Sequence, residues 1–314
     1  MTFKTALFSL LVATAATAQP NVFAPYVDMS KPASNLPQIQ AASGLHHFTL
    51  AFVIAGQGCV PAWAGTAPVQ SDTKITEYVD KLRQANGDVI VAFGGYDGTD
   101  LAQACPDVPE LQSAYQAVIN RYKVNVLDFD VEHLAIEDQP SIDRRSQALK
   151  ALAAANTGLQ INFTLPATPT GLTPQSLSVL KSAIQFGVPI SIVNLMAMDY
   201  GSPVLTGAMG PNAVAAASGA LCQMKSLGLN ARVGITPMIG VNDTLGEVFN
   251  LADAQTVLSY TLANSNSVGL LSFWSVGRDN GSCKETVSPT CSGIVQDDWA
   301  FAKIFQQFEK GSGK

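Results

Sequence analysis

The chain has 314 residues and a formal net charge of −6, from 18 Lys and Arg against 24 Asp and Glu. A mildly acidic chain without clusters of Lys or Arg is a poor candidate for binding nucleic acid or an anionic membrane surface. Its length allows one large domain or two small ones.

The first 18 residues have the pattern of a secretory signal peptide. Lys4 precedes a short apolar run, and the segment ends in Ala16-Thr17-Ala18. The run is too short to span a bilayer. We therefore expect a secreted, extracellular protein that begins near Gln19. Loss of a segment with one Lys and no acid would change the net charge from −6 to −7.

Short apolar runs then alternate with longer amphipathic runs to the end of the chain. The short runs predict eight strands, at Val22–Met29, Phe48–Ile54, Asp88–Gly94, Val126–Glu132, Leu159–Leu165, Ile190–Met198, Arg232–Ile239 and Val268–Trp274. Helical patterns lie between them, at Ile75–Gln84, Leu111–Tyr122, Ser146–Ala155, Pro174–Phe186, Ala213–Leu227, Leu251–Ala263 and Trp299–Phe308. Eight successive β-α units predict an α/β fold, a closed (β/α)8 TIM barrel rather than an open doubly wound sheet.

The predicted barrel fills almost the whole chain after the signal peptide. We expect one domain over residues 19–310 and a flexible tail at residues 311–314. Only about thirty residues separate the last two predicted strands, which leaves no room for a large insertion domain. The cleft above the barrel should therefore be shallow and open.

Five cysteines in a secreted protein imply disulfides with one thiol left over. Cys283 and Cys291 bracket a short loop and are the first expected pair. Cys59 and Cys105 each follow a predicted strand closely, so they could meet at one rim of the fold. Cys222 lies in an apolar helical pattern and is expected to be a buried free thiol. The spacing of cysteines and histidines suggests no zinc site.

The most informative segment is the fourth predicted strand, where three acids occupy alternate positions. Because successive strand side chains point to opposite faces, Asp128, Asp130 and Glu132 share one face. Like charges and burial both raise the pKa of a carboxyl group, so these acids must share a proton. A solvated edge strand or a calcium loop is the alternative, but a calcium loop has turn-forming residues between its ligands. Here Leu, Phe and Val intervene, which favours a functional site.

The segment from Asn125 to Glu132 resembles the signature D-G-x-D-x-D-x-E of glycoside hydrolase family 18, the chitinase family. Asp128, Asp130 and Glu132 match its three inner acidic positions. Asn125 stands where the family usually has Asp, and Val126 stands where it has Gly. The resemblance implies a barrel fold and identifies Glu132 as the catalytic acid.

Two more strand ends agree with the resemblance, because barrel enzymes gather their chemistry at the carboxyl ends of strands. Ala92-Phe93-Gly94-Gly95 is similar to the element S-x-G-G, with Ala for Ser. Met196 to Tyr200 looks like M-x-Y-D, with Met198 at the Tyr position and Asp199 in place. Tyr200 would then take over part of the role of the missing phenol. The alternatives are a glycine-rich turn and an apolar strand that ends in a turn.

Aromatic residues could form a floor for sugar rings. Trp274 ends the eighth predicted strand, and an aromatic face suits the apolar face of a pyranose. Core packing is the alternative for any Trp. Tyr96 and Trp63 are weaker candidates for outer subsites. His46, His47 and His133 have no recognisable hydrolase arrangement around them, so we expect them to be structural.

The resemblance implies hydrolysis of β-1,4 bonds between N-acetylglucosamine units of chitin or chito-oligosaccharides, with retention and with the substrate's own acetamido oxygen as nucleophile. Glu132 would protonate the leaving oxygen, Asp130 would orient the acetamido group, and Asp128 would support Asp130. Asp199, Tyr200 and Met198 would line the substrate site. We expect endo action, a monomer, and no metal or cofactor.

Two other functions fit the same motif. One is an endo-β-N-acetylglucosaminidase that cuts the core of N-glycans. The other is a catalytically silent chitin-binding lectin on the same barrel, although such relatives usually lose the acid that this chain retains as Glu132.

Overall fold

The structure of the chain is a computed structural model, which describes residues 20–31, 34–201 and 207–310. The predicted signal peptide and the predicted tail lie outside the described residues and remain predictions. Within the described part of the chain, no helix combines the length and the apolar character that a membrane crossing requires.

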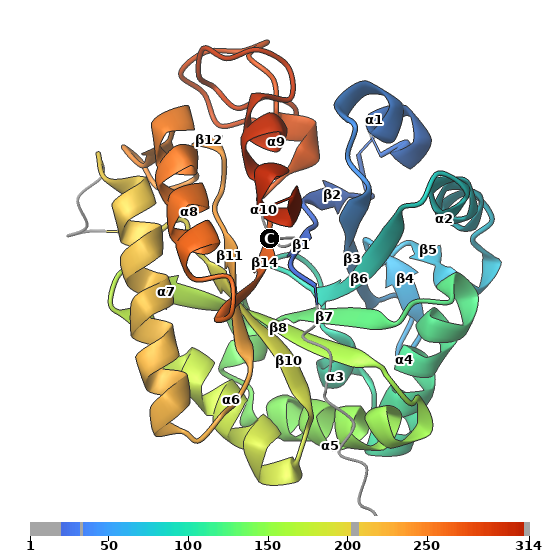
Figure 1. Cartoon of the computed structure of the whole chain (residues 1–314). Coiled ribbons are helices and arrows are strands. Elements are labelled where there is room, and N and C mark those ends of the chain that lie inside the picture. Colours follow the sequence, from blue (N-terminus) through green and yellow to red (C-terminus); the bar gives the residue numbers. More distant parts are fainter. Residues whose placement is uncertain (1–19, 32–33, 202–206, 311–314) are drawn as a thin grey trace, which may run out of the picture.

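Parallel strands at eight positions around a ring form a closed barrel, as the alternation of strand and helix patterns predicted (Figure 1). The first predicted strand is divided into β1 and β2, which pair with the last and the second barrel strands and so close the ring. The barrel strands are β1 (Val22–Phe23), β2 (Tyr26–Asp28), β3 (His47–Ala55), β6 (Asp88–Gly94), β7 (Val126–Asp130), β8 (Gln160–Thr168), β10 (Ile190–Met196), β11 (Arg232–Thr236) and β14 (Val268–Leu271).

Helices surround the barrel strands in Figure 1. They are α1 (Leu36–Ser43), α2 (Lys74–Gln84), α3 (Leu101–Ala104), α4 (Val108–Tyr122), α5 (Gln139–Ala155), α6 (Pro174–Phe186), α7 (Met209–Ser226), α8 (Leu251–Ala263), α9 (Ala300–Phe305) and α10 (Gln307–Lys310). Short 3-10 helices lie at η1 (Val69–Ser71), η2 (His133–Ile136) and η3 (Val276–Arg278). Several helices begin earlier than predicted, and α5 does so because its mainly polar first turns carry no clear apolar period.

Local sequence signals explain where these helices begin and end. Before α4, the side chain of Asp107 accepts a hydrogen bond from the backbone N–H of Glu110. At α8, Asn250 and Asp253 form a capping box in which each side chain accepts the other's backbone N–H. Helix α6 ends at Gly187, whose φ of 72° is the left-handed conformation that glycine adopts at low cost.

The outer face of the fourth barrel strand packs into an aromatic cluster. The ring of Phe129 on β7 stacks on Phe93 of β6, with centroids 5.2 Å apart, and meets the ring of Tyr115 on α4 at 5.1 Å. Phe163 on β8 extends the cluster at 6.0 Å from Phe129. Because side chains alternate along a strand, this packing turns Asp128 and Asp130 towards the barrel interior.

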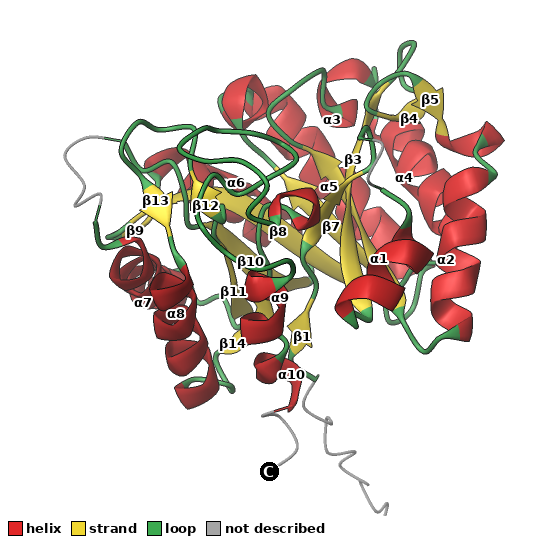
Figure 2. Ribbon diagram, turned by 90° about the horizontal axis from the view of Figure 1, so that it is seen from above, coloured by secondary structure: helices red, strands yellow, loops and turns green. Residues whose placement is uncertain are grey.

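The connection between β11 and β14 contains α8 and a small antiparallel hairpin, β12 (Gly240–Val241) with β13 (Val248–Phe249). The hairpin lies near α7 and α8 in Figure 2. No large insertion domain follows β11, as the spacing predicted. The remaining short strands are β4 (Pro61–Trp63), β5 (Ala67–Pro68) and β9 (Gly171–Leu172).

Both predicted disulfides are present. Cys59 and Cys105 are joined with Cα atoms 4.5 Å apart, and Cys283 and Cys291 with Cα atoms 5.9 Å apart. The prediction for Cys222 was wrong, since this free thiol is exposed. The buried stripe of α7 passes through Ala213, Ala217, Ala220 and Met224 at helical spacing, and Cys222, two residues from both Ala220 and Met224, faces the solvent.

Candidate active site

The three acids of the motif occupy the end of β7 and the first residues beyond it. Asp128 and Asp130 lie within the strand and are 1% and 6% exposed. The sequence predicted Glu132 within the strand, but it lies two residues beyond the end of β7. Its φ of −144° and ψ of −175° nevertheless keep the backbone extended. The backbone N–H of Val131 still donates to the Thr164 carbonyl of β8 at 3.0 Å. The alternation of side chains therefore continues to Glu132.

Asp128 lies at the end of a directed hydrogen-bond chain across the barrel. Thr236 donates to Asn194 Oδ1 at 2.9 Å, Asn194 donates to Thr164 Oγ1 at 3.0 Å, and Thr164 donates to Asp128 Oδ1 at 2.7 Å. The hydroxyl of Tyr26 donates to the other carboxylate oxygen at 2.8 Å. Burial raises the pKa of Asp128 to about 6, while the hydrogen bonds from Thr164 and Tyr26 oppose the rise.

Asp130 is buried but incompletely bonded. None of the described residues forms a hydrogen bond with its Oδ1. Burial raises the pKa of Asp130 well above its ordinary value, and the charges of Glu132, Asp128 and Asp100 raise it further. A buried carboxyl oxygen without a partner costs free energy in the unliganded protein, so it is suited to accept a hydrogen bond from a ligand.

Glu132 ionises close to neutral pH. Burial is the main cause that raises its pKa to about 7, and the negative charges of Asp199 and Asp97 contribute. A carboxyl group with this pKa is present in both protonation states near pH 7, which is what a general acid that later serves as a base requires.

The glycine pair after β6 allows the backbone of the acidic strand to approach closely. Gly94 has a φ of +90°, and a Cβ at this position would lie 2.0 Å from the Asp130 carbonyl oxygen. The Gly95 N–H donates to that same oxygen at 3.1 Å. A Cβ on Gly95 would in turn lie 2.7 Å from the ring of Phe52. Larger residues at these two positions would displace Asp130 or the aromatic floor.

The segment after β10 brings Asp199 and Tyr200 to the same end of the barrel. Asp199 has a φ of +47°, and its Oδ1 accepts the Thr244 N–H at 2.6 Å. Burial raises the pKa of Asp199. The Tyr200 hydroxyl is buried and has no hydrogen-bond partner among the described residues. Met198 is half-buried just beyond the strand end.

A group of aromatic rings covers the acids on the side of β2 and β3. Trp274 is half-buried, and its ring stacks on Phe52 with centroids 5.6 Å apart and an interplanar angle of 13°. The same indole lies 5.9 Å from the ring of Tyr26, which donates to Asp128. Ala92, which replaces the Ser of the family motif, packs in this cluster with Tyr26. Trp274 thus contacts Tyr26, which in turn bonds Asp128, and its role as a floor for a sugar ring remains a prediction.

Tyr96 and His133 form a second aromatic surface. Tyr96 is 62% exposed, and its ring is stacked on that of His133 with centroids 4.5 Å apart. His133 directly follows Glu132, so this pair lies beside the acid. Trp63 does not belong to the site, contrary to our expectation. It is 3% exposed, and its Nε1–H donates to the Tyr122 hydroxyl at 2.7 Å in the protein core.

Sequence reasoning missed several residues that surround the acids. They come from other strands or loops and are Tyr26, Phe52, Thr164, Asn194 and Glu247. Tyr26 and Thr164 are polar groups near the carboxyl ends of predicted strands, which was a usable signal. Glu247 lies in an irregular segment with no motif around it.

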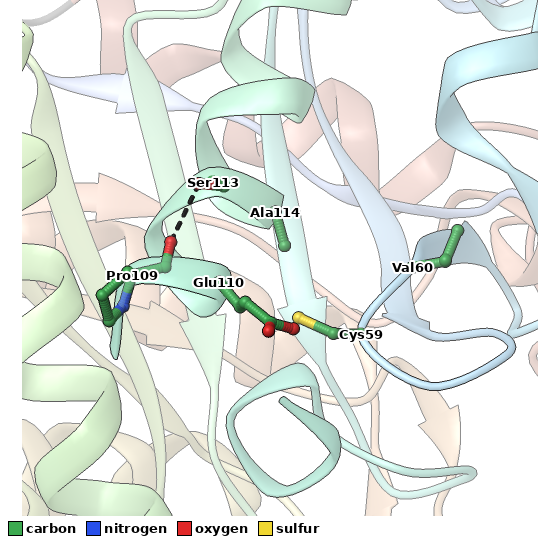
Figure 3. A pocket seen from close by; sticks show the side chains of 6 residues that line it. All are labelled: Cys59, Val60, Pro109, Glu110, Ser113 and Ala114. Atoms are coloured by element: carbon green, nitrogen blue, oxygen red, sulfur yellow. Dashed lines mark hydrogen bonds between the residues drawn. The ribbon is translucent and has the colours of Figure 1, made fainter. Parts of the chain in front are cut away.

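A separate surface pocket of about 470 Å³ lies between the β3–β4 connection and α4 (Figure 3). It is lined by Cys59, Val60, Pro109, Glu110, Ser113 and Ala114. None of the predicted catalytic or substrate-binding residues lines this pocket. In residues 20–31, 34–201 and 207–310, no group of three or more His, Cys, Asp or Glu side chains is arranged to hold a metal ion.

Glycoside hydrolases work with neighbouring carboxyl groups of which one holds a proton near neutral pH. The carboxyl end of a parallel barrel is also where enzymes of this fold carry out their chemistry. Glu132, with its raised pKa, and the adjacent aspartates meet both conditions. The fold and the site therefore place the chain in the class of barrel glycoside hydrolases.

Comparison with known proteins agrees with this class. No protein-family model matches the chain. It is 35% identical over 318 residues to a protein of Escherichia coli (strain K12) named "Probable bifunctional chitinase/lysozyme", covering 92% of this chain and 35% of that protein. It is 36% identical over 280 residues to "Endochitinase 11" of Metarhizium anisopliae, covering 82% of this chain and 52% of that protein. The chain thus spans about a third and about half of these two relatives.

A solved structure matches along nearly its full length. Active domain 2 of a thermostable chitinase from Pyrococcus furiosus, in a structure of catalytic-site mutants complexed with chito-oligosaccharides, has 32% sequence identity and a TM-score of 0.84. The match covers 96% of this chain and 99% of that domain. The chain belongs to glycoside hydrolase family 18, the chitinase family.

Proposed function

We propose that this protein is a secreted chitinase that hydrolyses β-1,4 bonds between N-acetylglucosamine units with retention of configuration, and that it cuts within chains. The observation that carries the proposal is the row of acids at the end of β7, in which one carboxyl oxygen of Asp130 has no hydrogen-bond partner among the described residues and the pKa of the nearby Glu132 is raised to about 7. The chito-oligosaccharide complex of the Pyrococcus furiosus domain supports the choice of substrate.

Glu132 would act first as an acid. Near its pKa of about 7 a large fraction of the carboxyl groups is protonated and can donate to the oxygen that leaves the sugar. The resulting carboxylate can then take a proton from the water that completes the reaction. One residue thus serves both steps, which fits the half-buried position of Glu132 between solvent and the barrel interior.

Asp130 would act on the acetamido group of the sugar at the cleavage site. Its Oδ1, which has no partner among the described residues, can accept a hydrogen bond from the acetamido N–H, which orients the acetamido oxygen towards the anomeric carbon. Attack by that oxygen creates a cyclic cation, and a carboxylate beside it stabilises the developing charge. The nucleophile therefore belongs to the substrate, as in the family that the chain belongs to.

Asp128 would control the proton that Asp130 holds in the unliganded protein. The pKa values of both carboxyl groups are raised, and the charge of Asp128 is among the causes that raise that of Asp130. The two carboxyl groups therefore share a proton rather than ionise together. The donors Tyr26 and Thr164 favour the ionised form of Asp128, so the resting proton resides on Asp130. Ionisation of Asp130 during the reaction requires that proton to pass to Asp128.

The surrounding residues would hold the sugar. The half-buried Trp274 ring offers a face for the pyranose at the cleavage site, and the exposed Tyr96 offers one farther out. Asp199 and the Tyr200 hydroxyl, which has no hydrogen-bond partner among the described residues, would bind the acetamido group from the carboxyl end of β10, beside Met198. The short connection after β11 supports an open cleft and thus endo action.

A substrate comparison tests this function directly. The protein should release reducing ends from colloidal chitin and chitohexaose but not trim a high-mannose glycoprotein, and Glu132→Gln should abolish release while the fold is kept. Preferential cleavage of the glycoprotein would favour an endo-β-N-acetylglucosaminidase. Chitin binding by the wild-type protein without any hydrolysis would favour a lectin.

A further inference from the structure

The segment that carries Asp199 and Tyr200 has a backbone conformation that needs external support. Asp199 has a φ of +47°, in the left-handed region, which Asp adopts more readily than most residues other than glycine but still at a cost. It lies three residues beyond the end of β10 and so lacks the hydrogen bonds of a strand or helix. We call residues 199–201 the acetamido corner, after the role proposed for Asp199 and Tyr200.

A single carboxylate bonds the backbone of this corner. Glu247 Oε2 accepts the Tyr200 N–H at 3.0 Å, and Oε1 accepts the Gly201 N–H at 2.8 Å. Glu247 lies just before β13 and is fully buried, with 0% exposure. Both carboxylate oxygens are therefore directed at two consecutive amides 46 and 47 residues away in the chain.

The loop that carries Glu247 is itself fixed to the corner. The Thr244 N–H donates to Asp199 Oδ1 at 2.6 Å, so the loop contacts the side chain of the corner as well as its backbone. The Glu247 N–H donates to the Thr244 carbonyl at 3.1 Å, and the Asn242 N–H donates to the Glu247 carbonyl at 3.0 Å. Glu247 is thus held at the centre of a closed turn.

The burial of Glu247 is costly and has no ionic compensation. Within the described residues, Glu247 forms no ion pair with Lys, Arg or His. Taking a carboxylate out of water costs free energy that hydrogen bonds to neutral amides only offset in part, whereas an apolar side chain would avoid the cost. The hydrogen bonds from Tyr200 N–H and Gly201 N–H explain why a carboxylate occupies this buried position.

We propose that Glu247 is a positioning residue that fixes the acetamido corner and so places Asp199 and Tyr200 for the substrate. Glu247 does not touch the substrate, because it is fully buried behind the corner. The inference rests on the proposed function, since it assumes that Asp199 and Tyr200 act on the acetamido group. It adds a buried residue from the β12–β13 hairpin, which no strand-end motif contains.

A graded pair of variants tests the role. Glu247→Gln keeps one acceptor oxygen and nearly the same shape, and Glu247→Ala removes both acceptors. The matched control is Asp253→Asn. Asp253 is a buried carboxylate whose two oxygens likewise accept backbone amides, from Gly210 at 2.7 Å and from Asn250 at 2.9 Å, and it makes none of the corner's contacts.

The measurements are kcat/KM on a chito-oligosaccharide, the inhibition constant of a thiazoline mimic of the cyclic intermediate, and hydrogen exchange at the Tyr200 and Gly201 amides. All are made at a temperature where circular dichroism shows the variants folded. Glu247→Gln should lower kcat/KM by about 10- to 100-fold, as expected for a misplaced binding group, and weaken the thiazoline by a similar factor. Its two corner amides should exchange faster. Asp253→Asn should keep both constants within about twofold of wild type.

Two results would overturn the proposal. A folded Glu247→Gln protein with kcat/KM and thiazoline inhibition within about twofold of wild type would show that the corner needs no such support. Equal decreases in kcat/KM and in thiazoline affinity in Glu247→Gln and Asp253→Asn would show a general effect of losing a buried carboxylate. If Glu247→Ala fails to fold, Glu247→Gln alone decides. A wild-type protein that does not cleave chito-oligosaccharides would refute the proposed function, and this inference with it.

Discussion

The Tyr26 hydroxyl donates a hydrogen bond to Asp128 Oδ2 at 2.8 Å, although the two residues are 102 positions apart in the sequence. The bond joins the first barrel strand to the acidic strand and is buried. It stabilises the ionised form of Asp128, which would otherwise be disfavoured by burial.

Replacing Tyr26 with Phe should therefore lower kcat by about 10- to 100-fold, by analogy with groups that orient metal-binding residues in metalloenzymes. The lost bond to a buried carboxyl group should also cost about 1 to 3 kcal/mol of unfolding free energy. Steady-state kinetics and chemical denaturation measure the two effects. Tyr122→Phe is the control. The Tyr122 hydroxyl donates to Asp72 Oδ2 at 3.1 Å, and neither residue belongs to the site. Similar kinetic losses in both variants would contradict a specific role for Tyr26.

Asp130→Asn should separate activity from stability. An amide cannot stabilise the cyclic cation as a carboxylate can, so kcat should fall by at least about 100-fold. The raised pKa of Asp130 means that the folded protein binds a proton that the unfolded chain releases above its own pKa of about 4. Because the folded protein binds more protons than the unfolded chain, the native state loses stability as pH rises above about 4. The Asn side chain does not ionise, so the variant lacks this loss. The melting temperature at pH 7 should thus be equal to or above that of wild type. A clear decrease, with activity retained, would indicate a structural role.

The pH dependence of kcat/KM should show the ionisation of Glu132. The acid must be protonated to donate, so activity should fall as pH rises through about 7. The negative charge of Asp97 contributes to the raised pKa of Glu132. Asp97→Asn should therefore move the alkaline limb to lower pH without a large change in the maximum rate. An unchanged limb in Asp97→Asn would mean that another group sets it.

A pH-sensitive contact joins the second barrel strand, β3, to the last helix, α10. His47 Nδ1 lies 2.9 Å from Glu309 Oε1, and this hydrogen bond is the main cause that raises the pKa of His47. A His whose folded pKa is raised contributes stability below its unfolded pKa, near 6.5, and this contribution is lost as pH rises through the folded pKa. His47→Gln should therefore lower the melting temperature more at pH 5.5 than at pH 8.5. Equal decreases at both values would exclude the ionic contribution.

The barrel and its acids could be predicted from the sequence because both depend on local spacing. Alternation of strand and helix patterns along the chain indicates a barrel, and the spacing of two residues between Asp128, Asp130 and Glu132 directs all three to one face. The structure bears out the face, although regular pairing ends at Asp130 and the chain turns into η2 after Glu132.

The positions of Tyr26 and Thr164 near predicted strand ends could be read from the sequence, but their bonds to Asp128 could not, because these residues come from distant segments. Tyr26 and Thr164 reach Asp128 only when the ring of strands closes. Glu247 bonds backbone amides, which have no sequence signature. The wrong predictions for Trp63 and Cys222 have a similar cause. Trp63 and Cys222 were judged by residue type and nearby pattern, whereas their exposure depends on which side of the chain packs on the barrel.

The stereochemistry of the first product tests the central claim most directly. When the substrate's own acetamido oxygen attacks the anomeric carbon, water must then enter from the original face, so the product keeps the β configuration. Proton NMR of chitohexaose hydrolysis, recorded before mutarotation, should show the β-anomer as the initial product. A thiazoline mimic of the cyclic intermediate should inhibit the same reaction. An initial α-anomer would contradict the mechanism, as would equal cleavage of a substrate with a free amine in place of the acetamido group at the cleavage site.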